Sequence, residues 1–236
     1  MRKTVLIWII LVAAANCCFS RNVYLVSAGI SDYPGTVNDL NLPANDAKAI
    51  YRLYLKNSKA KAVLLTNGNA TKDNILTKAR SHFANAKKDD IVVFFFSGHG
   101  YPGGFCAYDE LLPYHELKKV FASCKAKNKM IFADACFSGE FRGNHSGKKD
   151  PSSNVMLFLS SRDDETSIER RDMRNGFFTA CLLRCLKGGA DVNRDKVVTA
   201  KELFNAVSKG VKDLSKDRQH PVMWGNFEDN MPVMVW

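Results

Sequence analysis

Apolar residues along the chain fall into two patterns, short unbroken runs and helix-spaced positions, and the two patterns alternate. The clearest run is Ile91–Phe96, in which every residue is β-branched or aromatic and no helical period is visible. Such a run is typical of a strand buried on both faces in a parallel sheet. It ends in Ser97-Gly98-His99-Gly100, where two glycines allow a sharp turn. We therefore expect a histidine at the carboxyl end of a central strand, where open α/β sheets keep their active sites.

A second apolar run, within residues 129–133, ends in Asp134-Ala135-Cys136-Phe137-Ser138-Gly139. If the two strands are parallel neighbours, Cys136 and His99 reach the same edge of the sheet. The segment between them has room for a loop and one crossover helix, as a βαβ unit requires. A thiol beside an imidazole is the arrangement of an activated nucleophile. The two runs therefore predict Cys136 as nucleophile and His99 as general base.

The remaining pattern predicts alternating strands and helices over most of the chain. Further strands are expected over residues 22–28, 62–65 and 155–159. Helices are expected over residues 43–54, from Thr71 as N-cap to about 86, and over 114–126, 176–186 and 199–211. Residues 101–113 and 138–154 are expected to be loops. The alternation favours one α/β domain with a mostly parallel sheet of about six strands and helices on both faces.

The first twenty residues have the pattern of a signal peptide. Arg2 and Lys3 precede a short uncharged run, which ends in small residues and is short for a membrane span. We therefore expect an exported protein, secreted or periplasmic, with residues 1–20 as the signal and 21–236 as the mature domain. Lipid attachment at Cys17 or Cys18 is a minor alternative, and only such an anchor would bring the protein to a membrane.

The net charge is +10, but the lysines are scattered and no stripe of aromatic and basic residues accompanies them. We therefore expect no nucleic-acid binding. Five cysteines follow the signal region, and an odd number in an exported protein leaves at least one thiol unpaired, as a nucleophilic Cys136 requires. Cys106 with Cys124 is a candidate disulfide. Cys181 and Cys185, four apart on an expected helix, are more typical of core packing.

The paired Ser-Gly-His-Gly and Asp-Ala-Cys-Phe-Ser-Gly segments, each after an apolar strand, resemble those of the caspase-like cysteine peptidases. Within these the chain is most similar to the metacaspases, although Phe137 stands where their motif has a histidine. Gly-Ile-x-x-Tyr-Pro-Gly at residues 29–35, Ser160-Ser161, Gly-x-Phe-Thr from 176 and Gln-x-Pro from 219 fit the same family pattern. The resemblance covers nearly all of the chain after residue 21. It implies a caspase-like three-layer sandwich and an oxyanion hole made by the backbone N–H groups of Gly100 and Cys136.

The resemblance also implies a substrate pocket. Metacaspases cleave after Arg or Lys, and the matching positions here are Asp46, Ser97 and Asp134. A carboxylate pair in a partly dehydrated pocket favours a cationic side chain and repels an acidic one. We therefore expect protein or peptide substrates with basic residues. The alternative is that Asp134 is a turn residue at a strand end and Asp46 a favourable charge in the first turn of a helix.

No cofactor is expected to be required, although calcium remains a candidate ligand. Residues 191–202 match an EF-hand loop at Asp191, Asn193, Asp195 and Glu202, but Lys196 replaces the glycine of the tight turn. We favour the alternative of an Asp/Asn turn followed by a helix capped by Thr199. The aspartate cluster through which many metacaspases bind calcium has no clear counterpart, with Asp109 and Glu110 as partial remnants.

The sequence thus predicts an exported cysteine endopeptidase that cleaves after Arg or Lys through an acyl-enzyme. The basic loop at residues 138–154 offers Arg142, Lys148 and Lys149 as candidate self-processing sites. A clostripain-like or legumain-like specificity is an alternative within the same enzyme class. A catalytically inactive scaffold or binding protein is the alternative from another class, and Phe137 leaves it open. The oligomeric state is not predicted.

Overall fold

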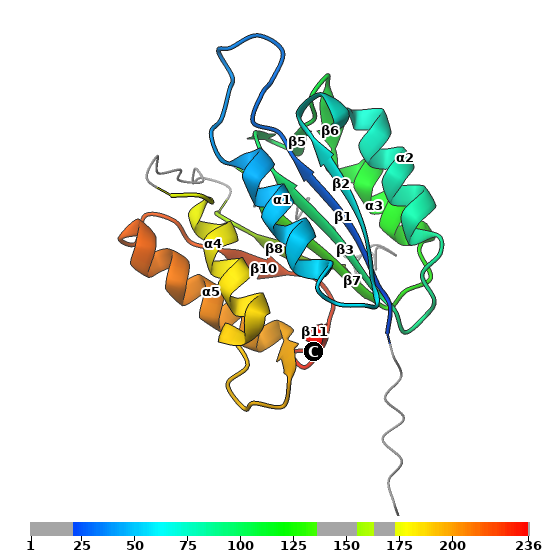
Figure 1. The fold of residues 1–236 in the computed structure, drawn as a ribbon, viewed down its shortest axis with the longest axis vertical. Helices are drawn as coiled ribbons and strands as arrows, with labels where there is room; N and C mark the ends of the chain where they lie inside the picture. The colour runs from blue at the N-terminus through cyan, green and yellow to red at the C-terminus, as the bar shows by residue number, and fades with distance from the viewer. Residues whose placement is uncertain (1–20, 136–154, 163–172, 236) are drawn as a thin grey trace, which may run out of the picture.

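A six-stranded sheet forms the centre of the molecule, as the computed structural model shows for residues 21–135, 155–162 and 173–235 (Figure 1). Its strand order is β10-β8-β7-β3-β1-β2. All neighbouring strands are parallel except β10, which runs antiparallel to β8. The mostly parallel sheet expected from the sequence is therefore confirmed. The strands are β1 (Val23–Gly29), β2 (Ala60–Thr66), β3 (Ile91–Ser97), β7 (Asn128–Asp134), β8 (Val155–Leu159) and β10 (Val222–Trp224).

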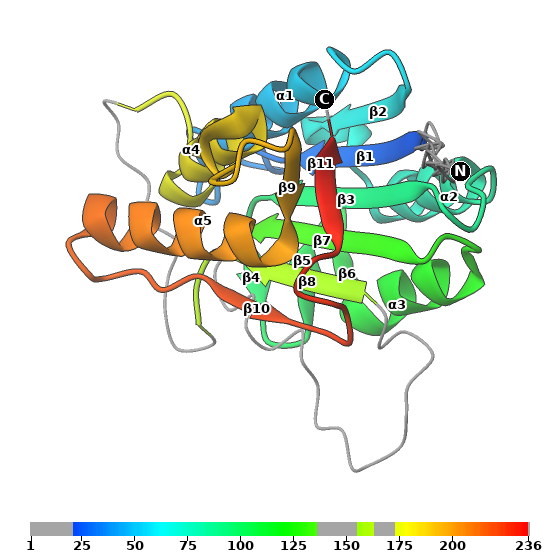
Figure 2. The ribbon, with the colours of Figure 1, turned by 90° about the horizontal axis from the view of Figure 1, so that it is seen from below.

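Helices cover both faces of this sheet and complete the three layers (Figures 1 and 2). Helices α2 (Lys72–Phe83) and α3 (Tyr114–Ser123) pack in one hydrophobic cluster with the sheet. On the opposite face lie α1 (Pro43–Tyr54), α4 (Phe177–Arg184) and α5 (Ala200–Ser215), which pack in a second cluster. The caspase-like α/β sandwich expected from the sequence is therefore confirmed.

The unbroken apolar run of β3 follows from this double coverage. Val92, Phe94 and Phe96 belong to the cluster with α2 and α3. Ile91, Val93 and Phe95 belong to the cluster on the other face. Successive strand side chains point to opposite faces, so a strand buried on both faces has no position for a polar residue.

Local chemistry fixes several helix starts at the predicted residues. Pro43 occupies the first turn of α1, where its missing N–H costs nothing. The Thr71 hydroxyl accepts a hydrogen bond from the Asn74 N–H at the start of α2. Thr199 and Glu202 form a reciprocal capping box at the start of α5. These contacts are local, which is why the sequence predicts them.

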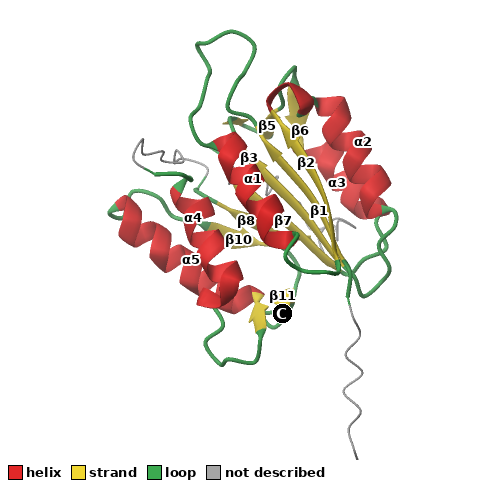
Figure 3. Cartoon of the chain, in the orientation of Figure 1, coloured by secondary structure: helices red, strands yellow, loops and turns green. Residues whose placement is uncertain are grey.

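Three parts of the chain differ from the prediction (Figure 3). The expected loop at 101–113 contains a separate antiparallel sheet of β4 (Gly100–Tyr101), β5 (Gly104–Cys106) and β6 (Leu111–Pro113). These strands are too short to show an alternating pattern. The C-terminal region adds β10 to the main sheet and pairs β9 (Val197–Thr199) with β11 (Pro232–Val235). Helix α3 ends at Ser123, and the buried Lys129 ammonium donates to the Phe121 carbonyl near that end.

The candidate disulfide between Cys106 and Cys124 is not formed, and both thiols are free. Cys124 is buried beside the C-terminal end of α2, where its Sγ donates to the Phe83 carbonyl at 3.5 Å. Cys106 lies on β5 in the small sheet. The expected core packing of Cys181 and Cys185 is confirmed, since both are buried in the cluster with α5. Within the part of the chain that the structure describes, no helix is long and apolar enough to span a bilayer.

One buried hydroxyl provides a test of the core. Tyr54 Oη is fully buried and has no hydrogen-bond partner among the described residues. A buried polar group without a partner costs free energy, so Tyr54→Phe is expected to raise the free energy of unfolding by about 1 kcal/mol. Urea unfolding of both proteins would measure it. Tyr51→Phe, a half-buried tyrosine of the same helix, is the matched control and is expected to change little. A lower urea midpoint for Tyr54→Phe would contradict the expectation.

Candidate active site

Gly98 brings His99 to the carboxyl end of β3. Its φ of 154° lies in a region that side chains rarely adopt, and an added Cβ would lie 2.8 Å from Tyr33 Oη. The Gly98 N–H donates to the Asp134 carbonyl of β7, so the turn is tied to the neighbouring strand. A glycine is therefore required where the sequence places it, directly before the histidine.

The His99 ring is held by groups from the loop after β1. Its Nε2 lies 2.9 Å from the Asn38 carbonyl oxygen, and its ring packs against Tyr33 with the centroids 5.1 Å apart. A carbonyl oxygen can only accept, so Nε2 carries the proton and Nδ1 is left as the basic nitrogen. The sequence indicated no Asn or Asp side chain that would orient His99. The orienting group is a backbone carbonyl, which has no signature in a sequence.

Tyr33 also fixes the backbone at His99. Its hydroxyl accepts from the His99 N–H at 3.0 Å and donates to the Cys106 carbonyl at 3.2 Å. Burial raises the pKa of Tyr33 far above its usual value, so the hydroxyl stays protonated and keeps both hydrogen bonds. Gly100, a predicted oxyanion-hole residue, follows directly as the first residue of β4.

Cys136 lies outside the described residues, which end on this side at Ala135. The strand leading to it is described, and β7 lies parallel to β3 with Ser97 opposite Asp134. In the sequence, His99 thus comes two residues after the end of β3, and Cys136 comes two residues after the end of β7, the neighbouring strand. That register is what the predicted dyad requires. The candidate self-processing residues of the 138–154 loop also lie outside the described residues.

The structure brings the three predicted pocket residues together at the carboxyl ends of β3 and β7. Ser97 Oγ donates to Asp46 Oδ2 at 2.9 Å, and both residues are buried. Asp134, at the end of β7, is only 7% exposed and lies near enough to Asp46 for their charges to interact. Three elements far apart in sequence, α1, β3 and β7, therefore place two carboxylates and a hydroxyl in one cluster.

The start of α4 completes this cluster with donors that the sequence did not identify as site residues. Asn175 Nδ2 and the Gly176 N–H donate to Asp46 Oδ1 at 2.8 and 3.2 Å. The N–H and hydroxyl of Thr179 donate to Asp134 Oδ2 at 3.1 and 2.8 Å. Gly176 must be a glycine here, because an added Cβ would lie 2.5 Å from Asp134 Oδ2. The Gly-x-Phe-Thr segment, recognised only as part of a family pattern, was the available signal.

Burial raises the pKa of Asp46 well above its usual value, and the Asp134 carboxylate raises it further. The hydrogen bonds from Asn175, Ser97 and Gly176 act in the opposite direction but do not offset these effects. An aspartate with a raised pKa stabilises the fold at low pH, and this contribution is lost as the pH rises through the raised pKa. The charged pair is therefore costly without a ligand, and a cation between the carboxylates would relieve that cost.

The side chains that match an EF-hand loop at residues 191–202 are engaged in local hydrogen bonds. Among the described residues, no group of three or more His, Cys, Asp or Glu side chains could hold a metal ion. Glu202 instead accepts from the N–H and hydroxyl of Thr199 as part of the capping box. The oxygens of Asp191, Asn193 and Asp195 accept from backbone N–H groups within the loop, as in an Asp/Asn turn. These contacts are those of an Asp/Asn turn followed by a helix capped by Thr199, the interpretation that the sequence favours. Calcium binding at this loop stays a prediction.

Comparison with known proteins agrees with this geometry. The family model described as the caspase domain, of the C14 peptidases, matches residues 26–231. Among solved structures, the chain is similar to protein GSU0716 from Geobacter sulfurreducens, a structural-genomics target, with a TM-score of 0.65 and 16% identity over 91% of this chain and 99% of that one. This second likeness shows the fold alone. No curated protein matches the chain. The chain belongs to the caspase-domain family, and this membership supports cysteine peptidase activity in general.

Proposed function

We propose that the protein is an exported cysteine endopeptidase that cleaves peptide bonds after Arg or Lys. The observation that carries the proposal is the buried cluster of Asp46, Ser97 and Asp134, which lies at the same carboxyl end of the sheet as His99. A cationic side chain from the substrate would neutralise the carboxylates, whereas an acidic one would add to their repulsion. The protein partners are thus substrates with basic residues, and no nucleic acid is expected among them.

In this mechanism His99 Nδ1 accepts the thiol proton of Cys136, and the thiolate attacks the scissile carbonyl carbon. The tetrahedral oxyanion is stabilised by the N–H groups of Gly100 and Cys136. Collapse expels the amine, which takes the proton from His99, and leaves a thioester between Cys136 and the acyl group. A water molecule, deprotonated by His99, then hydrolyses the thioester and regenerates the thiol. The hydrogen bond from Nε2 to the Asn38 carbonyl leaves Nδ1 free to take and return the proton in each half of the cycle.

Export is proposed from the pattern of residues 1–20, which lie outside the described residues. A secreted or periplasmic location follows, with lipid attachment at Cys17 or Cys18 as the minor alternative. No cofactor enters the mechanism, and calcium is retained only as a variable of the assay. A second candidate, an inactive caspase-like binding protein, rests on Phe137 in place of the histidine of the metacaspase motif.

Matched fluorogenic peptides ending in Arg, Lys or Asp, assayed with and without calcium, would test the proposal. Cleavage is expected after Arg and Lys, and Cys136→Ala is expected to abolish it. Cleavage after Asp would support the dyad and overturn the basic specificity. If no peptide is cleaved, even after limited nicking of residues 138–154, the inactive binding protein becomes the better account. Rapid alkylation of Cys136 near neutral pH would distinguish an activated thiolate from a structural thiol.

A further inference from the structure

Two serine hydroxyls hold the backbone of Ala135, the residue before Cys136. The Ala135 N–H donates to Ser160 Oγ at 3.2 Å, and Ser160 Oγ donates back to the Ala135 carbonyl at 3.2 Å. Ser161 Oγ donates to the same carbonyl at 3.4 Å. Ala135 is 1% exposed and both serines are 0% exposed, so water does not compete for these hydrogen bonds. Side chains from the end of β8 thus fix the chain just beyond β7.

The Ala135 carbonyl and the Cys136 N–H are the two ends of one peptide unit. A peptide unit is planar and trans, so its carbonyl and its N–H point in opposite directions. Hydroxyls that fix the direction of the carbonyl therefore also fix the direction of the N–H. Hydrogen bonds to the carbonyl further polarise the unit and make its N–H a stronger donor.

We propose that Ser160 and Ser161 are positioning residues for the oxyanion hole. They orient the Ala135–Cys136 peptide so that its N–H meets the oxyanion that develops on the scissile carbonyl. The inference rests on the proposed peptidase function and assigns these serines no contact with the substrate. It requires an oxyanion donor that is oriented before the reaction begins. Such preorganisation is the source of most of the stabilisation that these donors provide.

Ser160 is itself fixed from two sides. Its N–H donates to the Ala133 carbonyl of β7 at 2.9 Å. Its carbonyl accepts from Gln219 Nε2 at 2.9 Å. Gln219 is 0% exposed and comes from the turn that joins α5 to β10. The end of β8 is therefore clamped between the neighbouring strand and a residue almost sixty positions further along the chain.

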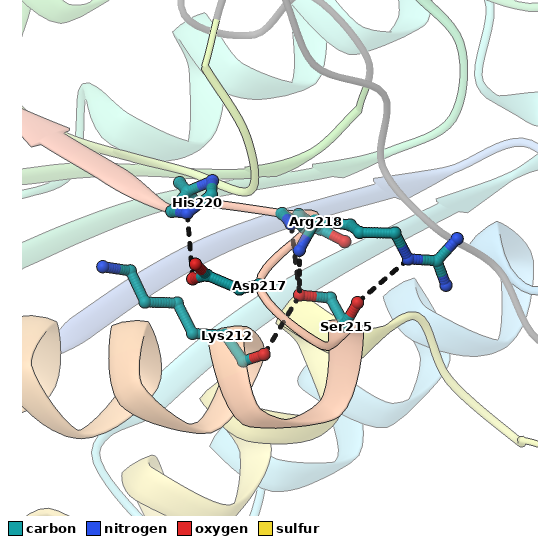
Figure 4. A network of polar contacts seen from close by, with 6 residues as sticks. Lys212, Ser215, Asp217, Arg218 and His220 are labelled. Atoms are coloured by element: carbon teal, nitrogen blue, oxygen red, sulfur yellow. Dashed lines mark hydrogen bonds and ion pairs between the residues drawn. The ribbon is translucent and has the colours of Figure 1, made fainter.

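The conformation of the turn before Gln219 directs this residue toward Ser160. Lys216 and Asp217 both have positive φ values, 54° and 60°, which cost non-glycine residues about 1–2 kcal/mol each. Ser215 compensates for part of this cost: its Oγ accepts from the N–H groups of Arg218 and Gln219 and donates to the Lys212 carbonyl (Figure 4). Arg218 Nε donates to the Ser215 carbonyl at 3.1 Å, and His220 Nε2 lies 3.1 Å from Asp217 Oδ1. This hydrogen-bonded turn therefore links α5 to Ser160 and so to the backbone of Ala135.

The test compares Ser161→Ala with Ser161→Thr, which keeps the hydroxyl. For an arginyl peptide, Ser161→Ala is expected to lower kcat about tenfold, less than the loss of a whole oxyanion donor, with little change in KM. A peptidyl argininal should lose affinity in parallel, because its carbon bonds to the Cys136 sulfur while its carbonyl electrons move to an oxygen in the oxyanion hole. Alkylation of Cys136 by iodoacetamide displaces iodide without forming an oxyanion, so its rate should not change.

Ser208→Ala is the matched control, since it removes another buried hydroxyl, one without a partner among the described residues. It is expected to leave kcat, argininal affinity and alkylation unchanged. Gln219→Met keeps the side-chain length and removes the donor to Ser160. Gln219→Met should lower kcat and argininal affinity as Ser161→Ala does, but by smaller factors, and should leave the alkylation rate unchanged. If Ser161→Ala fails to fold, Gln219→Met still tests whether the contacts around Ser160 act on the oxyanion hole.

Two results would overturn the inference alone: unchanged kcat and argininal affinity in folded Ser161→Ala and Gln219→Met, or an alkylation rate that falls as far as kcat. The second result would show a general loss of structure around the thiol rather than a misoriented N–H. A wild-type protein that neither cleaves the peptide nor binds the argininal would overturn the proposed function, and this inference with it. Recovery of kcat in Ser161→Thr would support the positioning role.

Discussion

Replacing His99 with alanine is expected to lower kcat/KM for an arginyl peptide by about 10³-fold, because general acid–base catalysis contributes on that scale. In the proposed mechanism its Nδ1 is the base in both half-reactions, and no other imidazole is expected to substitute for it. The ring is held by the Asn38 carbonyl and by Tyr33, so the catalytic nitrogen has a fixed direction. The Cys136 alkylation rate near neutral pH should fall with activity, since the imidazole also activates the thiol.

His82→Ala is the matched control for this prediction. His82 Nε2 also lies 2.9 Å from a backbone carbonyl, that of Lys61, but on α2 and away from the sheet edge of His99. Its replacement is expected to change kcat/KM less than twofold, within the range of substitutions away from special sites. Wild-type activity in His99→Ala would contradict the dyad, and the inactive binding protein would then be preferred.

Replacing Asp46 with asparagine is expected to lower kcat/KM for arginyl and lysyl peptides about 100-fold. Removing one partner of a buried, hydrogen-bonded charge pair costs about 2–5 kcal/mol, and 100-fold corresponds to a value near the lower end. Asparagine has almost the same shape and can still accept a hydrogen bond, so the fold should be retained. For peptides with an uncharged residue before the scissile bond, kcat/KM should fall far less. The ratio of kcat/KM for arginyl peptides to kcat/KM for uncharged peptides measures the specificity.

The effect of Asp46 should depend on pH. Its pKa is raised by burial and by Asp134, so at low pH the carboxyl is neutral and attracts a cation weakly. As the pH rises through that pKa, the ionised form should lower KM for arginyl peptides in the wild type but not in Asp46→Asn. Asp229→Asn, on an exposed residue that pairs with Lys201, is the control and should change neither KM nor its pH dependence. A constant ratio of wild-type to Asp46→Asn activity at all pH values would argue against an ionising Asp46.

The sequence alone predicted the frame of the active site, because the signals involved are local. An apolar run such as Ile91–Phe96 reports burial on both faces, and the glycines after it report a turn. The starts of α1, α2 and α5 were predicted from proline and threonine positions. The grouping of Asp46, Ser97 and Asp134 was predicted only through a family resemblance, since no local pattern relates residues so far apart.

Tertiary structure decided the groups that hold these residues in place. The Asn38 carbonyl that orients His99 is a backbone atom, and any residue could supply it. The donors of Asn175 and Thr179 reach the carboxylates only because α4 packs on the same face as α1, with its first turn beside Asp134 at the end of β7. Gln219 meets Ser160 because β10 returns antiparallel beside β8. The sequence by itself thus determined the strands, the helices and the candidate dyad, whereas only the packing of distant segments determined which buried polar groups satisfy one another.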